Sequence, residues 1–129
     1  MVQRISSGSP FEAKIGYSRA VKHADTVYVS GTTGYDYAKM TMPEDAGDQA
    51  RNALATIDKA LLEAGSSLED TVRVVYYLSD MAWYDAIVAV AGATFGEIRP
   101  AATMLVCGLT TPEMKIEIEV TARIGAHAS

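Results

Sequence analysis

A long amphipathic stretch in the first half of the chain constrains the fold more than any other feature of the sequence. Its apolar residues recur at spacings of three and four: Ala46, Ala50, Ala53, Leu54, Ile57, Ala60, Leu61 and Ala64. This spacing places them on one stripe of an α-helix, and such a stripe has to be buried against another element. Residues 41–44 (TMPE) are typical of a capping box with proline in the first turn, and Gly65 is placed to end the helix in a left-handed conformation.

Stretches with the period of two that β-strands show lie on both sides of this helix. In residues 115–120, isoleucine and valine alternate with lysine and glutamate, so the two kinds of side chain point to opposite faces. Strands are predicted over residues 3–6, 16–21, 26–30, 71–78, 101–106 and 114–122. A second helix is predicted over residues 81–95, with Asp80 as its cap.

This order of strands and helices predicts an α+β fold: a single mixed β-sheet with two helices on one face. The chain has 129 residues, which is the length of one ordinary domain, so we expect residues 1–129 to form a single domain. The other face of the sheet is then uncovered and carries tyrosine, threonine and methionine as well as charges. A broad, half-apolar bare face is typical of subunit contacts, so we expect an oligomer.

Charge and cysteine content exclude several classes of protein. Eleven basic residues are dispersed among sixteen acidic ones, so no nucleic-acid partner is expected. Cys107 is the one cysteine, which excludes an intrachain disulfide and favours a reducing compartment; we expect it to be a buried, small apolar residue. No apolar run approaches the ~20 residues that span a bilayer and no signal peptide is visible, so we expect a cytoplasmic protein without a membrane partner. No metal-ligand cluster or phosphate-binding glycine motif occurs, so no metal or other cofactor is expected.

Four stretches occur in a particular order along nearly the whole chain. They are residues 14–21 (KIGYSRAV), 27–32 (VYVSGT), 49–54 (QARNAL), and 99–101 (RPA) followed by 115–120 (KIEIEV). In this order and spacing they resemble the Rid/YjgF family of reactive-intermediate deaminases, whose members are also called endoribonuclease L-PSP or RidA proteins.

The resemblance implies a chorismate-mutase-like homotrimer, in which three sheets form a central barrel and a small-molecule ligand binds in a cleft at each subunit boundary. It also implies an enamine/imine deaminase, a hydrolase that converts short imino acids to 2-keto acids and ammonia without a cofactor.

Several residues match the family's site. Glu117 matches its glutamate; a carboxyl group in a partly desolvated cleft can have a raised pKa and activate water, although the residue can equally belong to a polar strand face. Tyr17 matches the tyrosine of the substrate loop, and its alternative is an ordinary aromatic anchor. Ser30 and Gly31 end a strand where family members offer backbone groups to the ligand, and glycine permits a close approach.

Three positions depart from the family's pattern, each towards an apolar residue. Ala102 stands in place of the arginine that binds the substrate carboxylate, Met104 in place of a cysteine, and Val88 in place of an asparagine on a helix. Hydrogen bonds to charged groups contribute about 1.5–3 kcal/mol, so losing the arginine is expected to cost on the order of ten- to a hundredfold with a carboxylate substrate. We therefore expect a ligand that is less charged or more hydrophobic than 2-iminopropanoate.

Two other arginines are candidates to replace the missing cation. Arg19 is therefore a candidate substrate-binding residue, and its alternative is a solvated strand residue. Arg99 lies three residues before Ala102, an odd offset that points to the opposite face of a strand, so a surface or interface salt bridge is expected there.

These observations favour a RidA-like hydrolase of the enamine/imine deaminase type with an atypical substrate. The alternative is a non-catalytic trimer of the same family that binds a small molecule or regulates a partner, so the sequence leaves it open whether the protein is an enzyme. A ribonuclease is disfavoured by the acidic charge and by the lack of a His/Lys catalytic pair.

Overall fold

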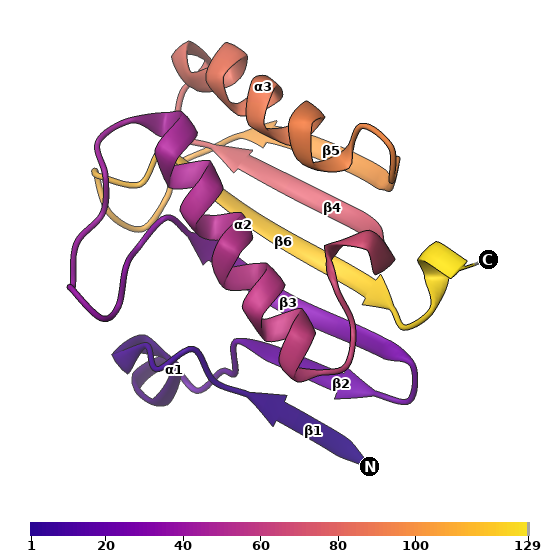
Figure 1. The fold of residues 1–129 in the computed structure, drawn as a ribbon. Helices are drawn as coiled ribbons and strands as arrows, with labels where there is room; N and C mark the ends of the chain where they lie inside the picture. The colour runs from indigo at the N-terminus through magenta and orange to yellow at the C-terminus, as the bar shows by residue number, and fades with distance from the viewer. Residues whose placement is uncertain (129) are drawn as a thin grey trace.

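Six strands form one mixed β-sheet in the order β1-β2-β3-β6-β4-β5 (Figure 1). The computed structural model describes residues 1–128. The strands are β1 (Val2–Ile5), β2 (Ala20–His23), β3 (Thr26–Thr33), β4 (Thr71–Leu78), β5 (Ala101–Val106) and β6 (Ile116–Arg123). Neighbouring strands are antiparallel except β4 and β5, which are parallel and therefore need a long crossover connection.

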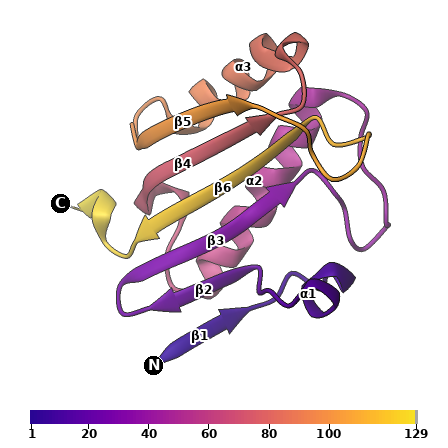
Figure 2. The same ribbon diagram turned by 180° about the vertical axis from the view of Figure 1, so that it is seen from behind.

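Two long helices cover one face of this sheet, as the sequence predicts. They are α2 (Ala46–Glu63) and α3 (Tyr84–Phe95), and α3 provides the crossover between β4 and β5. Figure 2 shows the opposite face of the sheet without a helix in front of it. Single turns of 3₁₀-helix occur as η1 (Leu68–Asp70), η2 (Met81–Trp83) and η3 (Ala126–Ala128). The α+β class with one mixed sheet is confirmed.

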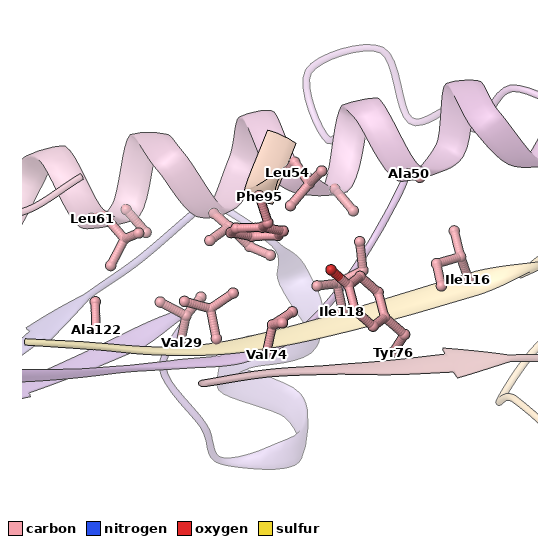
Figure 3. Packing of buried hydrophobic residues seen from close by; sticks show 14 of the residues in the cluster. Val29, Ala50, Leu54, Leu61, Val74, Tyr76, Phe95, Ile116, Ile118 and Ala122 are labelled. Atoms are coloured by element: carbon pink, nitrogen blue, oxygen red, sulfur yellow. The ribbon is translucent and has the colours of Figure 1, made fainter. Parts of the chain in front are cut away.

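The core lies between α2, α3 and the helix-facing side of the sheet. The apolar stripe of α2 points towards β3, β6 and β4, and Figure 3 shows Leu54 and Leu61 above Ile118 and Val74. Ile118 is 1% exposed, and its neighbours on β6 alternate as predicted between buried apolar and partly exposed polar residues. Burying one such large aliphatic side chain contributes roughly 1.5–3 kcal/mol, so the α2 stripe and the alternating strands together fix the face on which the helices lie.

The predicted N-terminal end of the long helix is wrong, and the predicted C-terminal end is confirmed. The helix is capped by Asp45, whose carboxylate accepts a hydrogen bond of 2.9 Å from the Asp48 N–H, and not by residues 41–44. The Gln49 side chain donates to the Pro43 carbonyl at 2.8 Å, which holds that segment outside the helix. At the other end Gly65 has φ +85° and donates to the Leu62 carbonyl at 3.1 Å, the left-handed termination that the sequence predicts.

The second predicted helix begins with a different geometry from the one expected. Residues 81–83 form the 3₁₀ turn η2, and the α-helix proper begins at Tyr84. Asp80 is the predicted cap, and its carboxylate accepts a hydrogen bond of 2.8 Å from the Ala82 N–H. No helix within residues 1–128 is both long and apolar enough to cross a membrane.

The N-terminal region and Cys107 differ from expectation. Residues Pro10–Ile15 form a short helix, α1, that the sequence analysis missed, and the second strand is Ala20–His23 rather than 16–21. Ser9 caps α1 and Gly16, with φ +90°, ends it, so an extended strand cannot begin at residue 16. Cys107 is exposed and not buried, since it follows the end of the edge strand β5, where Leu105 and Val106 are also exposed.

Candidate functional site

The predicted site residues fall into two groups that the chain does not bring together. Tyr17, Arg19, Ser30, Gly31 and Glu117 lie around the end of β3 and the start of β6, and we call them the Glu117 cluster. The other three lie on β5 and on α3. Strands β6 and β4 separate β3 from β5, which is visible in Figure 2.

Close contact between Gly31 and Glu117 defines the first group. A Cβ atom added at Gly31 would lie 2.0 Å from Oε2 of Glu117, so only glycine permits this approach. The pairing of β3 with β6 shifts register between Val29 and Thr32, which is a β-bulge at this point. The bulge and the missing side chain together make the space in which the Glu117 carboxyl group lies, on the face of the sheet opposite the helices.

The surroundings of Glu117 change its acidity. Burial raises the pKa of Glu117 above its ordinary value, the nearby charge of Glu119 acts in the same direction, and the positive charge of Arg19 opposes both. A carboxyl group with a raised pKa holds its proton more readily than an ordinary carboxyl group, which favours a role in general acid–base catalysis.

Arg19 is buried beside this carboxyl group and is bonded to protein acceptors. It is 1% exposed, so the alternative of a solvated strand residue is wrong; it precedes β2 and is enclosed by its partners. Its Nη1 donates to the Gly31 carbonyl at 2.8 Å and to the Thr32 hydroxyl at 3.0 Å, and its Nη2 donates to the Tyr17 hydroxyl at 3.1 Å. Its Nε donates to Ser7, so four of its five N–H groups are used. A role for Arg19 as the substrate's cation stays a prediction.

Glu12 is a member of this network that the sequence analysis missed. Its carboxylate accepts hydrogen bonds from the N–H and the hydroxyl of Ser7, at 3.0 and 2.6 Å, and lies 4.0 Å from Nε of Arg19. Burial raises the pKa of Glu12, and the Ser7 hydrogen bonds outweigh it, so the pKa lies below its usual range. Because Glu12 belongs to the unpredicted helix α1, no pattern in the sequence pointed to this pairing.

Tyr17 and Ser30 are also bonded within the chain. The Tyr17 ring lies beside the guanidinium of Arg19, with 5.4 Å between Cζ and the ring centroid. The Ser30 hydroxyl donates to the Ser18 carbonyl at 2.6 Å, and the Ser30 N–H donates to the Arg19 carbonyl at 2.9 Å. These bonds hold the backbone before Gly31 in place. The ligand-binding roles predicted for Tyr17 and Ser30 remain predictions.

Glu119 shares the strand face of Glu117 but is bonded differently. The Tyr77 hydroxyl donates a hydrogen bond to the Glu119 carboxylate, and this bond, with burial, raises the pKa of Tyr77 to about 12. Glu119 is thus held by a phenol, whereas no hydrogen bond holds the Glu117 side chain within residues 1–128. Of the two, Glu117 is the carboxyl group available for chemistry.

The second group surrounds a groove of about 300 Å³ between α3 and β5, which we call the α3–β5 groove. Its walls include Val74, Tyr76, Val88, Phe95, Arg99 and Ala102. Val88 and Ala102 therefore line the same groove, and their role in binding a ligand stays a prediction. Met104 does not line it, because its side chain is half-buried and packs against the core.

Arg99 lies in this groove, against the sequence-based expectation. The parity argument fails because β5 begins only at Ala101, and Arg99 precedes it with a left-handed φ of +56°. Its N–H donates to the Phe95 carbonyl at 2.8 Å and its Nε to the Gly96 carbonyl at 3.0 Å. Pro100 follows it, and because proline is typical of the first residue of a strand, it was the available signal that the strand starts after residue 99.

Within residues 1–128, no three side chains of His, Cys, Asp or Glu come together in a way that could hold a metal ion.

Comparison with known proteins agrees with the fold over most of the chain. The sequence model of the family described as Endoribonuclease L-PSP matches residues 8–124. An uncharacterised protein of Streptomyces coelicolor is 32% identical over 126 residues, which cover 97% of this chain and 94% of that protein.

Two solved structures are similar throughout their length. Rv2704 of Mycobacterium tuberculosis, described as a member of the YjgF/YER057c/UK114 family, has a TM-score of 0.87 and 38% identity, covering 96% of this chain and all of that one (100%). RidA from the Antarctic bacterium Psychrobacter has a TM-score of 0.81 and 28% identity, covering 94% of each chain.

Proposed function

The chain belongs to the endoribonuclease L-PSP family, also called the YjgF or RidA family, and on that premise we propose that it is a hydrolase of small imines and enamines. One observation carries the proposal: the Glu117 carboxyl group lies partly buried against Gly31, with its pKa raised by burial. The products are a carbonyl compound and ammonia.

Glu117 acts as the general acid–base group in this reaction. Its carboxylate takes a proton from a water molecule whose oxygen bonds to the imine carbon, and the carboxyl group passes that proton to the imine nitrogen, which gives a carbinolamine. A further proton then moves from the carbinolamine hydroxyl to the nitrogen by way of Glu117, the C–N bond breaks, and ammonia leaves as the C=O bond forms. A positioned group of this kind contributes roughly 10²- to 10⁴-fold to the rate.

The complete site lies between two chains in this proposal. The Glu117 cluster of one chain faces the α3–β5 groove of the next, in a homotrimer whose sheets surround a central barrel. The bare face of the sheet supports it, because Tyr28 and Leu105 are exposed there by 54% and 48%. The small-molecule ligand binds at these subunit boundaries.

The proposal also covers the cofactors, the cellular location and the binding partners of the protein. Hydrolysis of an imine consumes only water, and the proposal assigns the proton transfers to Glu117 without a metal or other cofactor. The exposed thiol of Cys107 supports a reducing, cytoplasmic location. A net charge of −5 is unfavourable for binding nucleic acid.

The test is hydrolysis of 2-iminopropanoate and 2-iminobutanoate, produced in place by an amino-acid oxidase. We expect Glu117→Gln to lower the rate at least a hundredfold, because an amide cannot exchange a proton with water. Glu63→Gln, the same change at an exposed residue at the end of α2, is the control and should leave the rate unchanged.

Two outcomes decide against this function. Full activity in Glu117→Gln removes the proposed role of the carboxyl group. No hydrolysis of any imine by the wild type, together with a raised melting temperature in the presence of a metabolite, establishes the alternative of a non-catalytic small-molecule-binding trimer.

A further inference from the structure

The β-bulge beside Glu117 needs support from outside the sheet. The pairing of β3 with β6 shifts register between Val29 and Thr32, so that Ser30 and Gly31 together face one residue of β6. A bulged residue is left out of the ladder of hydrogen bonds between the strands, and its backbone carbonyl then needs another donor. The shape of this segment therefore depends on groups that do not belong to the β3–β6 ladder.

The guanidinium group of Arg19 supplies that donor. Its Nη1 donates to the Gly31 carbonyl at 2.8 Å and to the Thr32 hydroxyl at 3.0 Å. The same hydroxyl donates to the Ser30 carbonyl at 2.8 Å, so one side chain holds the whole bulge in place. The backbone of Gly31 borders the space that Oε2 of Glu117 occupies. The position of the bulge thus decides where that carboxyl group can lie.

Arg19 has little capacity left to bind a ligand. It is 1% exposed, and its other hydrogen bonds go from Nε to the Ser7 hydroxyl at 3.3 Å and from Nη2 to the Tyr17 hydroxyl at 3.1 Å. The Glu12 carboxylate lies 4.0 Å from Nε and compensates the buried positive charge. A substrate carboxylate would have to displace several of these acceptors, so the geometry favours a supporting task over direct binding.

We propose that Arg19 is a positioning residue: by holding the bulge at Gly31, it places the carboxyl group of Glu117 for proton transfer without touching the substrate. The inference rests on the proposed function, because Glu117 performs the proton transfers there. An arginine suits this task, since its planar fork of five N–H groups reaches acceptors in several segments at once, whereas the ammonium group of a lysine is a point charge with three donors.

The positive charge of Arg19 also acts on Glu117. Burial raises the pKa of Glu117 most, the charge of Arg19 lowers it, and the charge of Glu119 raises it. Tyr77 pairs with Glu117 across β4 and β6, and its hydroxyl is bonded to Glu119. Replacing Arg19 with lysine keeps the charge and loses the fork, whereas replacing it with glutamine loses both. The two variants therefore separate the position of the carboxyl group from its pKa.

Turnover of two kinds of imine tests the proposal. 2-Iminopropanoate carries a carboxylate, and butan-1-imine, produced in place by an amine oxidase, carries none. We expect Arg19→Lys and Arg19→Gln to lower kcat at least tenfold for every imine that the wild type hydrolyses and to leave KM within threefold, because a displacement of about 1 Å can cost roughly a hundredfold in rate. A rise in KM for 2-iminopropanoate with kcat unchanged would show that Arg19 binds the substrate, and would overturn the proposal.

Matched variants exclude a general loss of structure. Arg51→Lys and Arg51→Gln change an exposed arginine of α2 and should leave kcat unchanged. Thr32→Val removes one acceptor of Arg19 and keeps its charge, so we expect kcat to fall at least threefold. This variant keeps the test valid if the Arg19 variants do not fold. An unchanged kcat in Thr32→Val, or in an Arg19 variant that folds, would refute the positioning role.

An NMR titration of the ¹³C-labelled carboxyl group of Glu117 separates this inference from the proposed function, because it needs no substrate. The signal is identified by its absence in Glu117→Gln. We expect Arg19→Gln to raise the pH midpoint, and Arg19→Lys and Arg51→Gln to leave it near the wild-type value. A midpoint that stays unchanged in Arg19→Gln would contradict the inference.

Two combinations of results show which of the two ideas fails. If the wild type hydrolyses no imine, but Arg19→Lys and Thr32→Val both shift the Glu117 carboxyl signal, the proposed function fails and the placement of Glu117 by Arg19 stands. If imines are hydrolysed and the Arg19 variants turn them over as fast as the wild type does, the function stands and the inference fails.

Discussion

Asp70 and His127 form an ion pair that connects the C-terminal turn η3 to η1. Asp70 is the buried partner of the pair. Nδ1 of His127 lies 2.5 Å from Oδ1 of Asp70, and the Ser66 hydroxyl donates to Oδ2 at 2.7 Å. Burial raises the pKa of Asp70, but the hydrogen bonds from His127 and Ser66 outweigh it and leave the pKa at about 2. The bond to Asp70 raises the pKa of His127. No local pattern in the sequence indicates this pair, because its members lie 57 residues apart.

The pair predicts a stability that depends on pH in two directions. The raised pKa of His127 adds stability that is complete below the ordinary value of 6.5 and is lost as the pH rises through the folded-state value. The depressed pKa of Asp70 adds stability that is present above 3.8 and is lost as the pH falls towards 2. We therefore expect His127→Ala to lower the melting temperature more at pH 6 than at pH 9, measured by thermal unfolding. His23→Ala is the control, and an equal loss at both pH values would contradict the coupling.

The ends of helices and strands were predictable where a local sequence signal marks them. They were missed where two neighbouring segments could each provide the helix cap or where the element is very short. The strands Thr71–Leu78 and Ala101–Val106 occur at the predicted bounds, because their β-favouring residues and flanking turns are local signals. The start of α2 was misplaced because residues 41–44 resemble a cap as much as Asp45 does, and a contact from Gln49 decides between them. The helix Pro10–Ile15 is too short for its periodicity to be visible.

Two glycines in similar surroundings are expected to respond oppositely to alanine. Gly65 has φ +85° and open space where a Cβ would lie, so Gly65→Ala should destabilise the protein by about 1 kcal/mol through the backbone alone. Gly92 lies inside α3 with equally open space and no such φ, so Gly92→Ala should stabilise it by about 0.5–1 kcal/mol. Urea unfolding measures both values. A loss of stability in both variants would show that steric contact, rather than φ, controls these positions.

The whole molecule presents one covered and one bare sheet face. Leu105 on β5 pairs with Tyr77 of β4 and is 48% exposed on the bare face, while Leu62 is 59% exposed on the outer side of α2. A single chain can hold this sheet because the residues on its helix-facing side form the hydrophobic core. In the proposed trimer, the neighbouring subunits cover the bare face.

Replacing either leucine with aspartate tests whether the bare sheet face or the outer side of α2 is a subunit contact. We expect the wild type to sediment at three times the 13.8 kDa of one chain, and Leu105→Asp to lower this mass because a carboxylate is costly to bury in a subunit contact. Leu62→Asp is the matched control on the helix side and should keep the wild-type mass. A trimer that survives Leu105→Asp would mean that the bare face around β5 is not the contact.

The sequence by itself determined the two long helices, most of the strands and the class of fold, because the stripe of α2 and the alternation of residues 116–120 are local patterns that specify which side of each element is buried. The resemblance of its motifs also pointed to Glu117 and Gly31, which the structure brings into contact. Only the tertiary structure decided that Arg19 is enclosed by protein acceptors and that Arg99 lies in the groove beside Ala102. The contacts of Arg19 join segments that are separate in the chain, and the position of Arg99 depends on a left-handed turn. The periodicity of a single segment predicts neither.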